Sequence, residues 1–445
     1  MASPVNPPRG MRDFLPADKA RRERVLAVIR SVFAAHGFDE IETPVMEDSA
    51  RLHAGLGGDN EKLAFGVLKR GLTAEDFAAA TDALDLADLG LRFDLTVPLA
   101  RFYASHRAEL PTVFRAIQAA PVWRAERPQK GRYRQFMQCD IDIIGEAGVL
   151  AEIELLTATA DTFTALGLTG CTIRINDRRL LVGMLETLGF GSESHDQVLI
   201  TIDKLDKVGE DGVIAELRAR GTARGVERGT ERGADAPAVD ALEQFFRRPQ
   251  STEFLSFGER AIRAALPVGA DDAVVAELTA IGAAVGRVGR SAPASRPTIE
   301  FDPFLVRGMG YYTGTIFEIA HPDLPYSLGG GGRYDGMIGR FLGVDVPAAG
   351  FSIGFERIVD LVQLHNDESA GGIALVYDSD VTSARLMQLK SELIASGRRV
   401  RLEHAPRNLK PLLAQLEASG FVEMATVSGS TSTVAELRMR KLSAE

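Results

Sequence analysis

A long block with only helical patterning divides the strand-forming part of this 445-residue chain. Residues 191–296 are rich in Ala, Glu and Arg, and their apolar side chains recur with a helical period. The residues before and after this block show short apolar runs and period-two alternation, which are typical of strands. We therefore expect an α+β protein whose sheet is built from residues 1–190 and 297–366, with residues 191–296 as a helical insertion.

The two ends of the chain add simpler patterns. Residues 18–35 carry an apolar stripe that predicts an amphipathic helix, and a short strand is expected at residues 40–43. The sequence DESAGG at residues 367–372 predicts a linker. Residues 373–445 then read IALVY, ARLMQLKSELIAS, RRVRLE, LKPLLAQLEAS and EMATVS, in the order strand, helix, strand, helix, strand. This alternation predicts a small C-terminal α/β domain.

Composition excludes several classes of protein. No apolar run approaches the ~20 residues that a membrane span needs. The N-terminus lacks the apolar core of a signal peptide. Cys139 and Cys171 belong to no paired motif, which argues against a disulfide framework or a zinc site and favours the cytoplasm. The net charge of −10 argues against a chain coated in nucleic acid but leaves room for a local basic site.

One such basic window lies in the segment WRAERPQKGRYRQFMQCDIDIIG. Its end, QCDIDIIG, alternates apolar and acidic residues and predicts a half-buried strand, so the segment is expected to form a hairpin with a cationic tip. Arg124 is placed on the entering strand, where its guanidinium suits a phosphate, and Phe136 can lie against a planar base. A solvated basic hairpin is the alternative. The basic residues of the window are Arg115, Arg124, Arg127, Lys130, Arg132 and Arg134.

Two further segments carry candidate ligand groups. In GFSIGFER, alternating small residues lead into a helix near Glu356 and Arg357. An arginine at a helix start opposes the helix dipole, which favours a ligand role for Arg357 over an exposed one. In LRFDLTVPLARF, Asp94 and Thr96 lie two residues apart and are expected on one strand face, where a carboxylate and a hydroxyl can hold an ammonium group. A structural role for this Asp–Thr pair is the alternative.

The segment VRGMGYYTGTIFE is predicted as a strand in which Arg307 and Tyr311 share one face while Tyr312 lies on the other. Glycines weaken a strand interior unless something must approach its backbone closely, so this strand is expected to border a ligand. If Arg307 and Tyr312 contact one substrate, the strand must twist or bulge near Gly308–Gly310. A further strand is predicted at residues 326–332, and the glycine-rich GGGGRYDG is predicted as a turn.

Together these segments resemble the histidyl-tRNA synthetase family of class II aminoacyl-tRNA synthetases. RGMRDFLP and the helix leading to Pro44 are similar to the family's opening and motif 1, WRAERPQKGRYRQF to motif 2, and GFSIGFER to motif 3. RGMGYYTGTIFE is similar to the histidine-specific signature, and IDKLDKVGEDGV to a stretch of the family's insertion. Gly310 and Met137 depart from the residues usual at their positions. The resemblance implies an antiparallel catalytic sheet flanked by helices and a C-terminal anticodon-binding domain.

The resemblance also implies a reaction, in which ATP with Mg²⁺ activates L-histidine to histidyl-adenylate and the histidyl group passes to the 3′ end of tRNA(His). By the same resemblance the protein is a cytoplasmic homodimer with no membrane partner, and no protein ligand of the metal is assigned. The implied catalytic residues are Arg307 and Arg124. The implied ATP contacts are Arg124, Glu126, Arg132, Phe136 and Arg357. The implied histidine contacts are Asp94, Thr96, Gln138, Asp142, Arg307, Tyr311, Tyr312 and Tyr334. The implied tRNA contacts are Arg127, Gln129, Arg399 and Arg407.

Three alternatives remain open at this point. A catalytically inactive synthetase-like regulatory subunit of histidine biosynthesis shares much of the pattern, although such proteins typically lack the arginine of the signature and the anticodon domain. Another class II specificity shares motifs 1 to 3 but not Arg307 with Tyr312. A pure RNA-binding module has no need of an arginine set suited to ATP. The Arg-Gly segment at residues 220–233 is either a flexible solvated stretch or an RNA-contacting arm.

Overall fold

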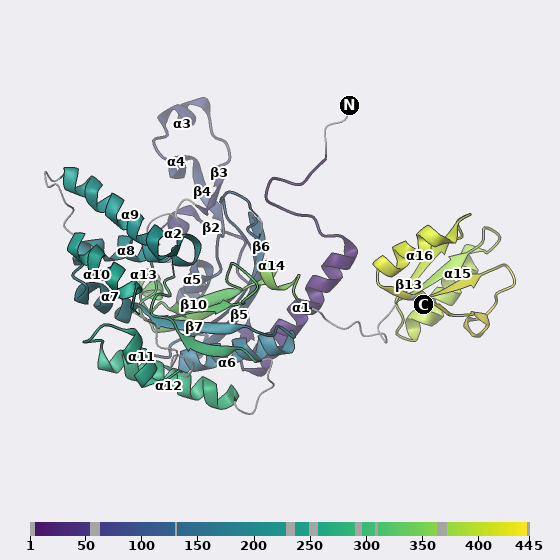
Figure 1. Ribbon diagram of the computed structural model, residues 1–445. Helices are drawn as coiled ribbons and strands as arrows, with labels where there is room; N and C mark the ends of the chain where they lie inside the picture. The colour runs from purple at the N-terminus through teal and green to yellow at the C-terminus, as the bar shows by residue number, and fades with distance from the viewer. Residues whose placement is uncertain are drawn as a thin grey trace. The chain divides into compact units, whose positions relative to one another are not determined.

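The computed structural model describes residues 5–53, 63–129, 131–227, 236–248, 257–289, 296–307, 310–362 and 372–442 (Figure 1). The chain divides into two compact units. The first consists of residues 1–12 and 25–362, and the second of residues 13–24 and 363–445. The linker predicted at residues 367–372 lies outside the described residues except for Gly372, which begins a strand.

An eight-stranded sheet forms the centre of the first unit, in the order β1-β5-β6-β11-β10-β9-β7-β8. All neighbours pair antiparallel except the two outermost pairs, β1 with β5 and β7 with β8. The expected α+β class and antiparallel sheet are confirmed. The strands are β1 (Asp39–Glu40), β5 (Phe114–Trp123), β6 (Gln135–Ile144), β7 (Thr172–Asp177), β8 (Thr298–Phe301), β9 (Thr315–Ala320), β10 (Gly329–Arg333) and β11 (Ala348–Gly354).

The basic window forms the expected hairpin, with β5 and β6 paired over their whole length. Successive side chains of a strand point to opposite faces. On β6 the apolar set Cys139, Ile141 and Ile143 is fully buried, and α6 (Leu150–Ala165) packs on β6 and β11. The prediction of a half-buried strand is wrong, because Asp140 and Asp142 on the other face are also buried. They line a pocket instead of meeting bulk water.

Residues 329–333 form β10 in the middle of the sheet, which overlaps the strand predicted at residues 326–332 and takes the place of the turn predicted over the same glycines. Close neighbours explain why glycine is required here despite its poor strand propensity. A Cβ added at Gly331 would lie 1.9 Å from the Gly350 carbonyl oxygen, and one added at Gly330 would lie 2.7 Å from the Arg307 guanidinium carbon. At the end of β10, Arg333 donates from Nε to Glu152 of α6 over 2.7 Å, and this buried pair fastens the strand to the helix.

The described part of the block predicted as helical consists of helices joined by turns and short loops. In Figure 1 these helices gather beside the sheet, with α12 next to α6. The helix α9 continues through the first part of the Arg-Gly segment to Glu227, and residues 228–235 lie outside the described part of the chain. The helices of this block are α8 (His195–Ile202), α9 (Leu205–Glu227), α10 (Ala236–Phe246), α11 (Glu259–Ala265) and α12 (Asp272–Gly289).

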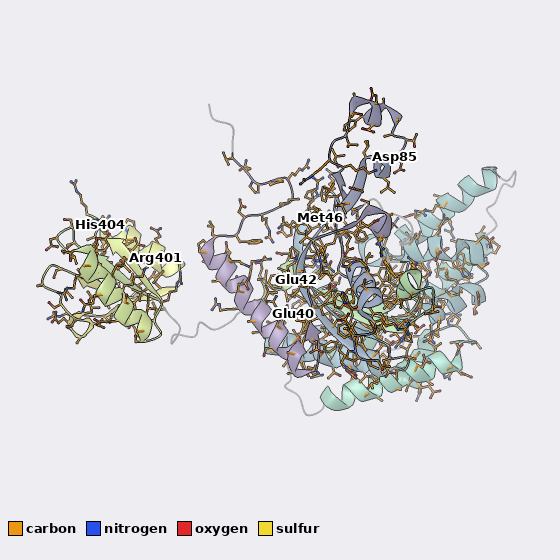
Figure 2. All side chains as sticks on the ribbon, turned by 180° about the vertical axis from the view of Figure 1, so that it is seen from behind. Glu40, Glu42, Met46, Asp85, Arg401 and His404 are labelled. Carbon is orange, nitrogen blue, oxygen red and sulfur yellow. The ribbon has the colours of Figure 1, made fainter. Side chains whose placement is uncertain are left out.

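A small three-stranded sheet, in the order β2-β4-β3, was not predicted. Together with three short helices it forms an arm on the first unit, and Asp85 lies far out along this arm (Figure 2). Its elements are β2 (Met46–Asp48), α2 (Ser49–His53), β3 (Phe65–Leu68), α3 (Ala74–Ala79), α4 (Ala83–Leu86) and β4 (Ala87–Leu91). The remaining helices of this part are α1 (Pro16–Ala35), which begins two residues before the predicted helix, α5 (Thr96–His106), α7 (Arg178–Thr187), α13 (Gly336–Leu342) and α14 (Phe355–Ile358).

The second unit has the predicted alternation of strands and helices. Its four-stranded sheet has the order β13-β12-β14-β15, with β12 parallel to both β13 and β14. No helix among the described residues is both long enough and apolar enough to cross a bilayer. The elements are β12 (Gly372–Tyr377), α15 (Ser383–Ala395), β13 (Val400–His404), α16 (Leu409–Ala418), β14 (Phe421–Val427) and β15 (Arg440–Lys441).

Candidate active site

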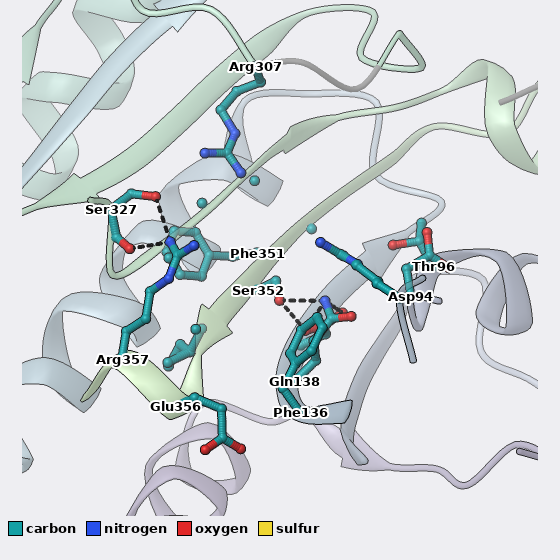
Figure 3. Close-up of a pocket in the computed structure, with 18 of the residues that line it drawn as sticks. Asp94, Thr96, Phe136, Gln138, Arg307, Ser327, Phe351, Ser352, Glu356 and Arg357 are labelled. Carbon is teal, nitrogen blue, oxygen red and sulfur yellow. Dashed lines mark hydrogen bonds between the residues drawn. The ribbon is translucent and has the colours of Figure 1, made fainter. Parts of the chain in front are cut away.

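A pocket over β6, β10 and β11 collects every residue predicted to contact ATP or histidine (Figure 3). In Figure 3, Arg307 and Arg357 point toward one space from separate elements, with Asp94 and Thr96 across it. Segments that are far apart in the sequence therefore meet at one place, as the predicted roles require. The predicted residues that line it are Asp94, Thr96, Arg124, Glu126, Arg132, Phe136, Gln138, Asp142, Arg307, Tyr311, Tyr312, Tyr334 and Arg357.

The loop between β5 and β6 supplies one wall of the pocket. Arg124 lies just after the last residue of β5 and not within the strand, and its Nε donates to the Phe93 carbonyl over 2.9 Å. Its guanidinium carbon lies 5.0 Å from the centre of the Phe136 ring. Arg132 and Glu126 pair across the loop at 3.4 Å. The backbone bond holds Arg124 in place while most of its guanidinium remains available to a ligand.

Four arginines, Arg124, Arg132, Arg307 and Arg357, line the pocket, and Arg132 and Arg307 pair with the carboxylates of Glu126 and Glu318. Arg357 donates from Nη1 to the Ser327 carbonyl over 2.6 Å, which holds it against the start of β10. Burial lowers the pKa of Arg357, and the positive charges of Arg132, Arg307 and Arg124 lower it further, although Glu318 opposes them. Such mutual repulsion is unfavourable unless an anion binds between the cations. The wall is therefore suited to a polyanion such as a triphosphate.

Arg307 does not lie on a strand, so the predicted strand across residues 306–313 is wrong. The chain from residue 302 to 307 and from 310 to 314 runs as turns and loop, and β9 begins only at Thr315. Because no strand alternation applies, Arg307 and Tyr312 both line the pocket without the bulge that a strand would need; residues 308 and 309 lie outside the described part.

Glu318 of β9 holds Arg307 in this position. Arg307 Nη1 donates to Glu318 Oε2 over 2.5 Å, and Arg174 lies 3.8 Å from the other oxygen of that carboxylate. Burial would lower the pKa of Arg307, but Glu318, Tyr312 and Asp203 together hold it above its ordinary value. Arg307 Nε is buried and makes no hydrogen bond to the part of the chain that the structure describes, which leaves this donor for a ligand.

Asp94 lies on a turn and Thr96 begins α5, so neither lies on a strand face, which corrects the predicted local structure. The turn follows β4 and leads into α5, and Asp94 Oδ1 accepts from the Val97 backbone N–H over 3.2 Å at the start of that helix. Burial raises the pKa of Asp94 to about 6, although this hydrogen bond and Arg124 oppose the rise. Asp94 Oδ2 is buried and has no hydrogen-bond partner.

A second buried acceptor without a partner is Gln138 Oε1. Buried polar atoms are almost always hydrogen-bonded, so two orphaned acceptors on one pocket wall point to a bound donor. An ammonium group carries three donors and a positive charge, and it satisfies both atoms at once. The charge also suits Asp94, whose ionised form is disfavoured by burial until a cation arrives.

Asp142 and three tyrosines form the deep end of the pocket. Tyr334 donates from its hydroxyl to Asp142 Oδ1 over 2.5 Å, and the Tyr311 and Tyr312 rings lie 4.8 Å apart. Burial raises the pKa of Asp142 to about 7, with the Tyr334 hydrogen bond opposing it and Asp94 adding to it. Gly350 makes room for this carboxylate, because a Cβ there would lie 1.9 Å from Asp142 Oδ1.

Sequence patterns missed several residues of the site. Asp140 and Ser352 line the pocket beside Gln138, and Glu318 holds Arg307 from behind. The alternation in QCDIDI already places Asp140 on the face of Gln138 and Asp142, so this residue was within reach of the sequence. Nothing local to Glu318 or to Ser327 marks them, because their partners come from other elements.

The residues predicted to contact tRNA are not gathered in the pocket. Arg127 and Gln129 are exposed on the loop between β5 and β6. Arg399 and Arg407 are exposed on the second unit, where the Arg399 guanidinium lies 4.5 Å from the centre of the Phe421 ring. Arg401 and His404 lie nearby on β13 (Figure 2).

The family model described as histidyl-tRNA synthetase matches residues 10–358. The chain is 58% identical to the histidine–tRNA ligase of Leifsonia xyli subsp. xyli, over 98% of both chains. It is 44% identical to a probable histidine–tRNA ligase of Tropheryma whipplei, over 94% of both.

Solved structures agree with these relatives. A histidyl-tRNA synthetase from Nostoc sp. PCC 7120 has a TM-score of 0.74 at 25% identity and covers 99% of this chain and 95% of its own. A Bacillus halodurans protein described as an ATP phosphoribosyltransferase regulatory subunit/histidyl-tRNA synthetase, with a TM-score of 0.70 at 20% identity, shares the fold over 96% of this chain and 100% of its own. On the family model and the two close relatives, this chain belongs to the histidyl-tRNA synthetase family.

Proposed function

We propose that the protein is a histidine–tRNA ligase that activates L-histidine with ATP and transfers the histidyl group to the 3′ end of tRNA(His). The observation that carries this proposal is the pairing of an arginine-lined wall with two unpartnered buried acceptors in one pocket. A triphosphate suits the arginines, and an amino acid ammonium suits Asp94 and Gln138. The 58% identical relative named as a histidine–tRNA ligase supports the same conclusion.

In the first step a carboxylate oxygen of histidine attacks the α-phosphorus of ATP. The bond from that phosphorus to the bridging oxygen of the β-phosphate breaks, and pyrophosphate leaves. Such transfers depend on positioning and on neutralising charge. We assign Arg124 and Arg307 to the α-phosphate and Arg357 to the γ-phosphate end. Mg²⁺ would enter with ATP, because hard cations bind phosphate oxygens.

The remaining pocket residues sort into two groups. Glu126 and Phe136 would hold adenine, the first through its amino group and the second by stacking, and Arg132 would contact ATP from the loop. Asp142 and Tyr312 would each accept or donate at one nitrogen of the imidazole ring, with Tyr311 and Tyr334 enclosing it. A site that pairs with both ring nitrogens discriminates strongly against analogues lacking them, because its own buried groups would be left unpaired.

In the second step the terminal ribose hydroxyl of the tRNA attacks the histidyl carbonyl carbon, and AMP leaves. We assign Arg127 and Gln129 to the acceptor end, and Arg399 and Arg407 to the anticodon side. The working protein is proposed to be a cytoplasmic homodimer. Exposed apolar side chains on and beside the β2-β4-β3 sheet, including Met46 and Leu89, support an interface there (Figure 2).

The fold alone does not separate this function from that of a regulatory subunit, since the Bacillus halodurans structure has the same fold. The difference lies in the site. Arg307, Tyr311 and Tyr312 are present and line the pocket. The second unit contains the four-stranded sheet of the C-terminal domain, which regulatory subunits typically lack. These features favour the catalytic reading over the regulatory alternative.

Purified protein is expected to exchange labelled pyrophosphate into ATP only when L-histidine and Mg²⁺ are present. Each of the other amino acids, including proline and threonine, should leave the exchange at background. If histidine gives no more exchange than buffer does, the synthetase proposal is wrong.

Glu318→Gln is expected to slow this exchange by about 10-fold at an unchanged KM for histidine, because Arg307 loses the charge that orients it. Glu300→Gln is the matched control, since Glu300 is an exposed carboxylate that lies opposite Arg174 in the strand register. A faster exchange in Glu318→Gln would mean that Glu318 restrains Arg307 instead of positioning it.

A further inference from the structure

Asp140 is a buried carboxylate that lines the pocket beside the proposed histidine contacts Gln138 and Asp142. The proposed function gives Asp140 itself no role. It lies between Gln138 and Asp142 on the pocket face of β6. Ser352 donates from Oγ to Asp140 Oδ1 over 2.5 Å. Gln138 Nε2 lies 2.9 Å from Ser352 Oγ and 3.4 Å from Asp140 Oδ2. The three side chains form one hydrogen-bonded cluster.

The strand register shows that Ser352 is placed for this cluster. In the antiparallel pair β6–β11, Gly354 lies opposite Gln138, Ser352 opposite Asp140 and Gly350 opposite Asp142. The two glycines offer no side chain to their partners on β6. The hydroxyl of Ser352 therefore lies opposite Asp140, where its carboxylate needs a hydrogen-bond donor. Figure 3 shows Ser352 and Gln138 joined in this way at the pocket wall.

The carboxylate sets the direction of every hydrogen bond in the cluster. An ionised carboxylate only accepts, so the Ser352 hydroxyl must donate to Asp140. The serine oxygen can then only accept from Gln138, and the amide must turn its NH₂ toward the cluster. Gln138 Oε1 is left facing away from the cluster, buried and without a partner.

We propose that Asp140, acting through Ser352, is a positioning residue that fixes the Gln138 amide with its oxygen toward the substrate and so makes the pocket select an α-ammonium group. This inference rests on the proposed function, because the substrate is taken to be histidine. Without the carboxylate, a serine hydroxyl and an amide can pair in either direction. In one of these two directions the amide turns its NH₂ group toward the substrate, where it repels the ammonium group.

Burial, Asp142 and Asp94 raise the pKa of Asp140 well above its ordinary value, whereas the hydrogen bond from Ser352 and the charge of Arg124 oppose the rise. The ionised carboxylate that orients the Gln138 amide is therefore the form expected in the complex with the ammonium group.

The test compares two ligands of the free enzyme by calorimetry: L-histidine, which has the ammonium group, and imidazole propionate, which lacks it. In Asp140→Asn the Kd of histidine is expected to rise on the order of 10-fold, the scale of one charge-assisted hydrogen bond. The Kd of imidazole propionate should stay within about 2-fold, because that ligand has no ammonium for Gln138 to read. An equal loss for both ligands would mean that Asp140 only supports the pocket.

A double-mutant cycle tests whether Asp140 acts through Gln138. In the Gln138→Ala background, Asp140→Asn should no longer weaken histidine binding, since the amide to be oriented is gone. If the full loss persists there, Asp140 acts on the ammonium directly and the inference is overturned. Wild-type protein that binds no histidine at all would instead contradict the proposed function itself, so the two failures are distinguishable.

Discussion

Replacing Arg307 by alanine is expected to slow adenylate formation by at least about 100-fold while histidine binding stays nearly intact. The arginine lines the pocket between the predicted phosphate wall and the tyrosines, and its buried Nε has no hydrogen-bond partner among the described residues. A donor aimed at charge that develops during the reaction contributes mainly to kcat. The measurement is pyrophosphate exchange at saturating ATP, with histidine affinity measured separately by calorimetry.

The matched control for this variant is Arg107→Ala, which removes an exposed arginine just after α5 and should leave both quantities unchanged. Thermal unfolding must accompany the comparison, because the variant leaves Glu318 with Arg174 as its neighbouring cation. An equal loss of histidine affinity and of rate would show that Arg307 serves the structure of the pocket and not the reaction.

Asp94→Asn is expected to raise the KM for histidine on the order of 100-fold, the scale of losing one member of a buried charge pair. Asparagine keeps an oxygen for the Val97 N–H but offers the ammonium no charge. The pH dependence gives an independent readout. Because the pKa of Asp94 is about 6, the wild-type KM should rise as the pH falls below that value, since the protonated carboxyl cannot pair with a cation.

The same variant is expected to be more stable than the wild type at neutral pH without ligand. The pKa of Asp94 is higher in the folded protein, about 6, than its ordinary value of 3.8, so the folded state binds more protons between these two values. Stability therefore falls as the pH rises through that range, and the loss is complete above about 6. Asparagine removes this loss. A variant that is both less stable and normal in KM would show that Asp94 is a structural residue.

Local pattern was sufficient for much of this protein. The hairpin β5–β6, the small-residue strand β11 before Arg357 and the alternation β12-α15-β13-α16-β14 all follow from short-range periodicity. Local periodicity predicts these elements correctly because each of them buries one regular face of its helix or strand. The predicted pocket residues were also brought together, although they were chosen from five separate segments.

Local pattern failed where a tertiary contact outweighed a propensity. The glycines of β10 form a strand because the Gly350 backbone and the Arg307 guanidinium leave no room for a Cβ, a reason that is invisible in GGGGRYDG alone. The segment from Arg307 to Thr313 alternates like a strand but runs as a loop, and Asp94 lies on a helix-entry turn. In both places the pocket, and not the local sequence, determines the backbone.

The sequence by itself predicted which side chains line the pocket, because their identities and spacing resemble a known family. Only the tertiary structure decided how they are held. Glu318 reaches Arg307, and Ser352 links Asp140 to Gln138, across strands that are distant in the chain. Such contacts depend on strand register, and register is set by the packing of the whole sheet and not by any one segment.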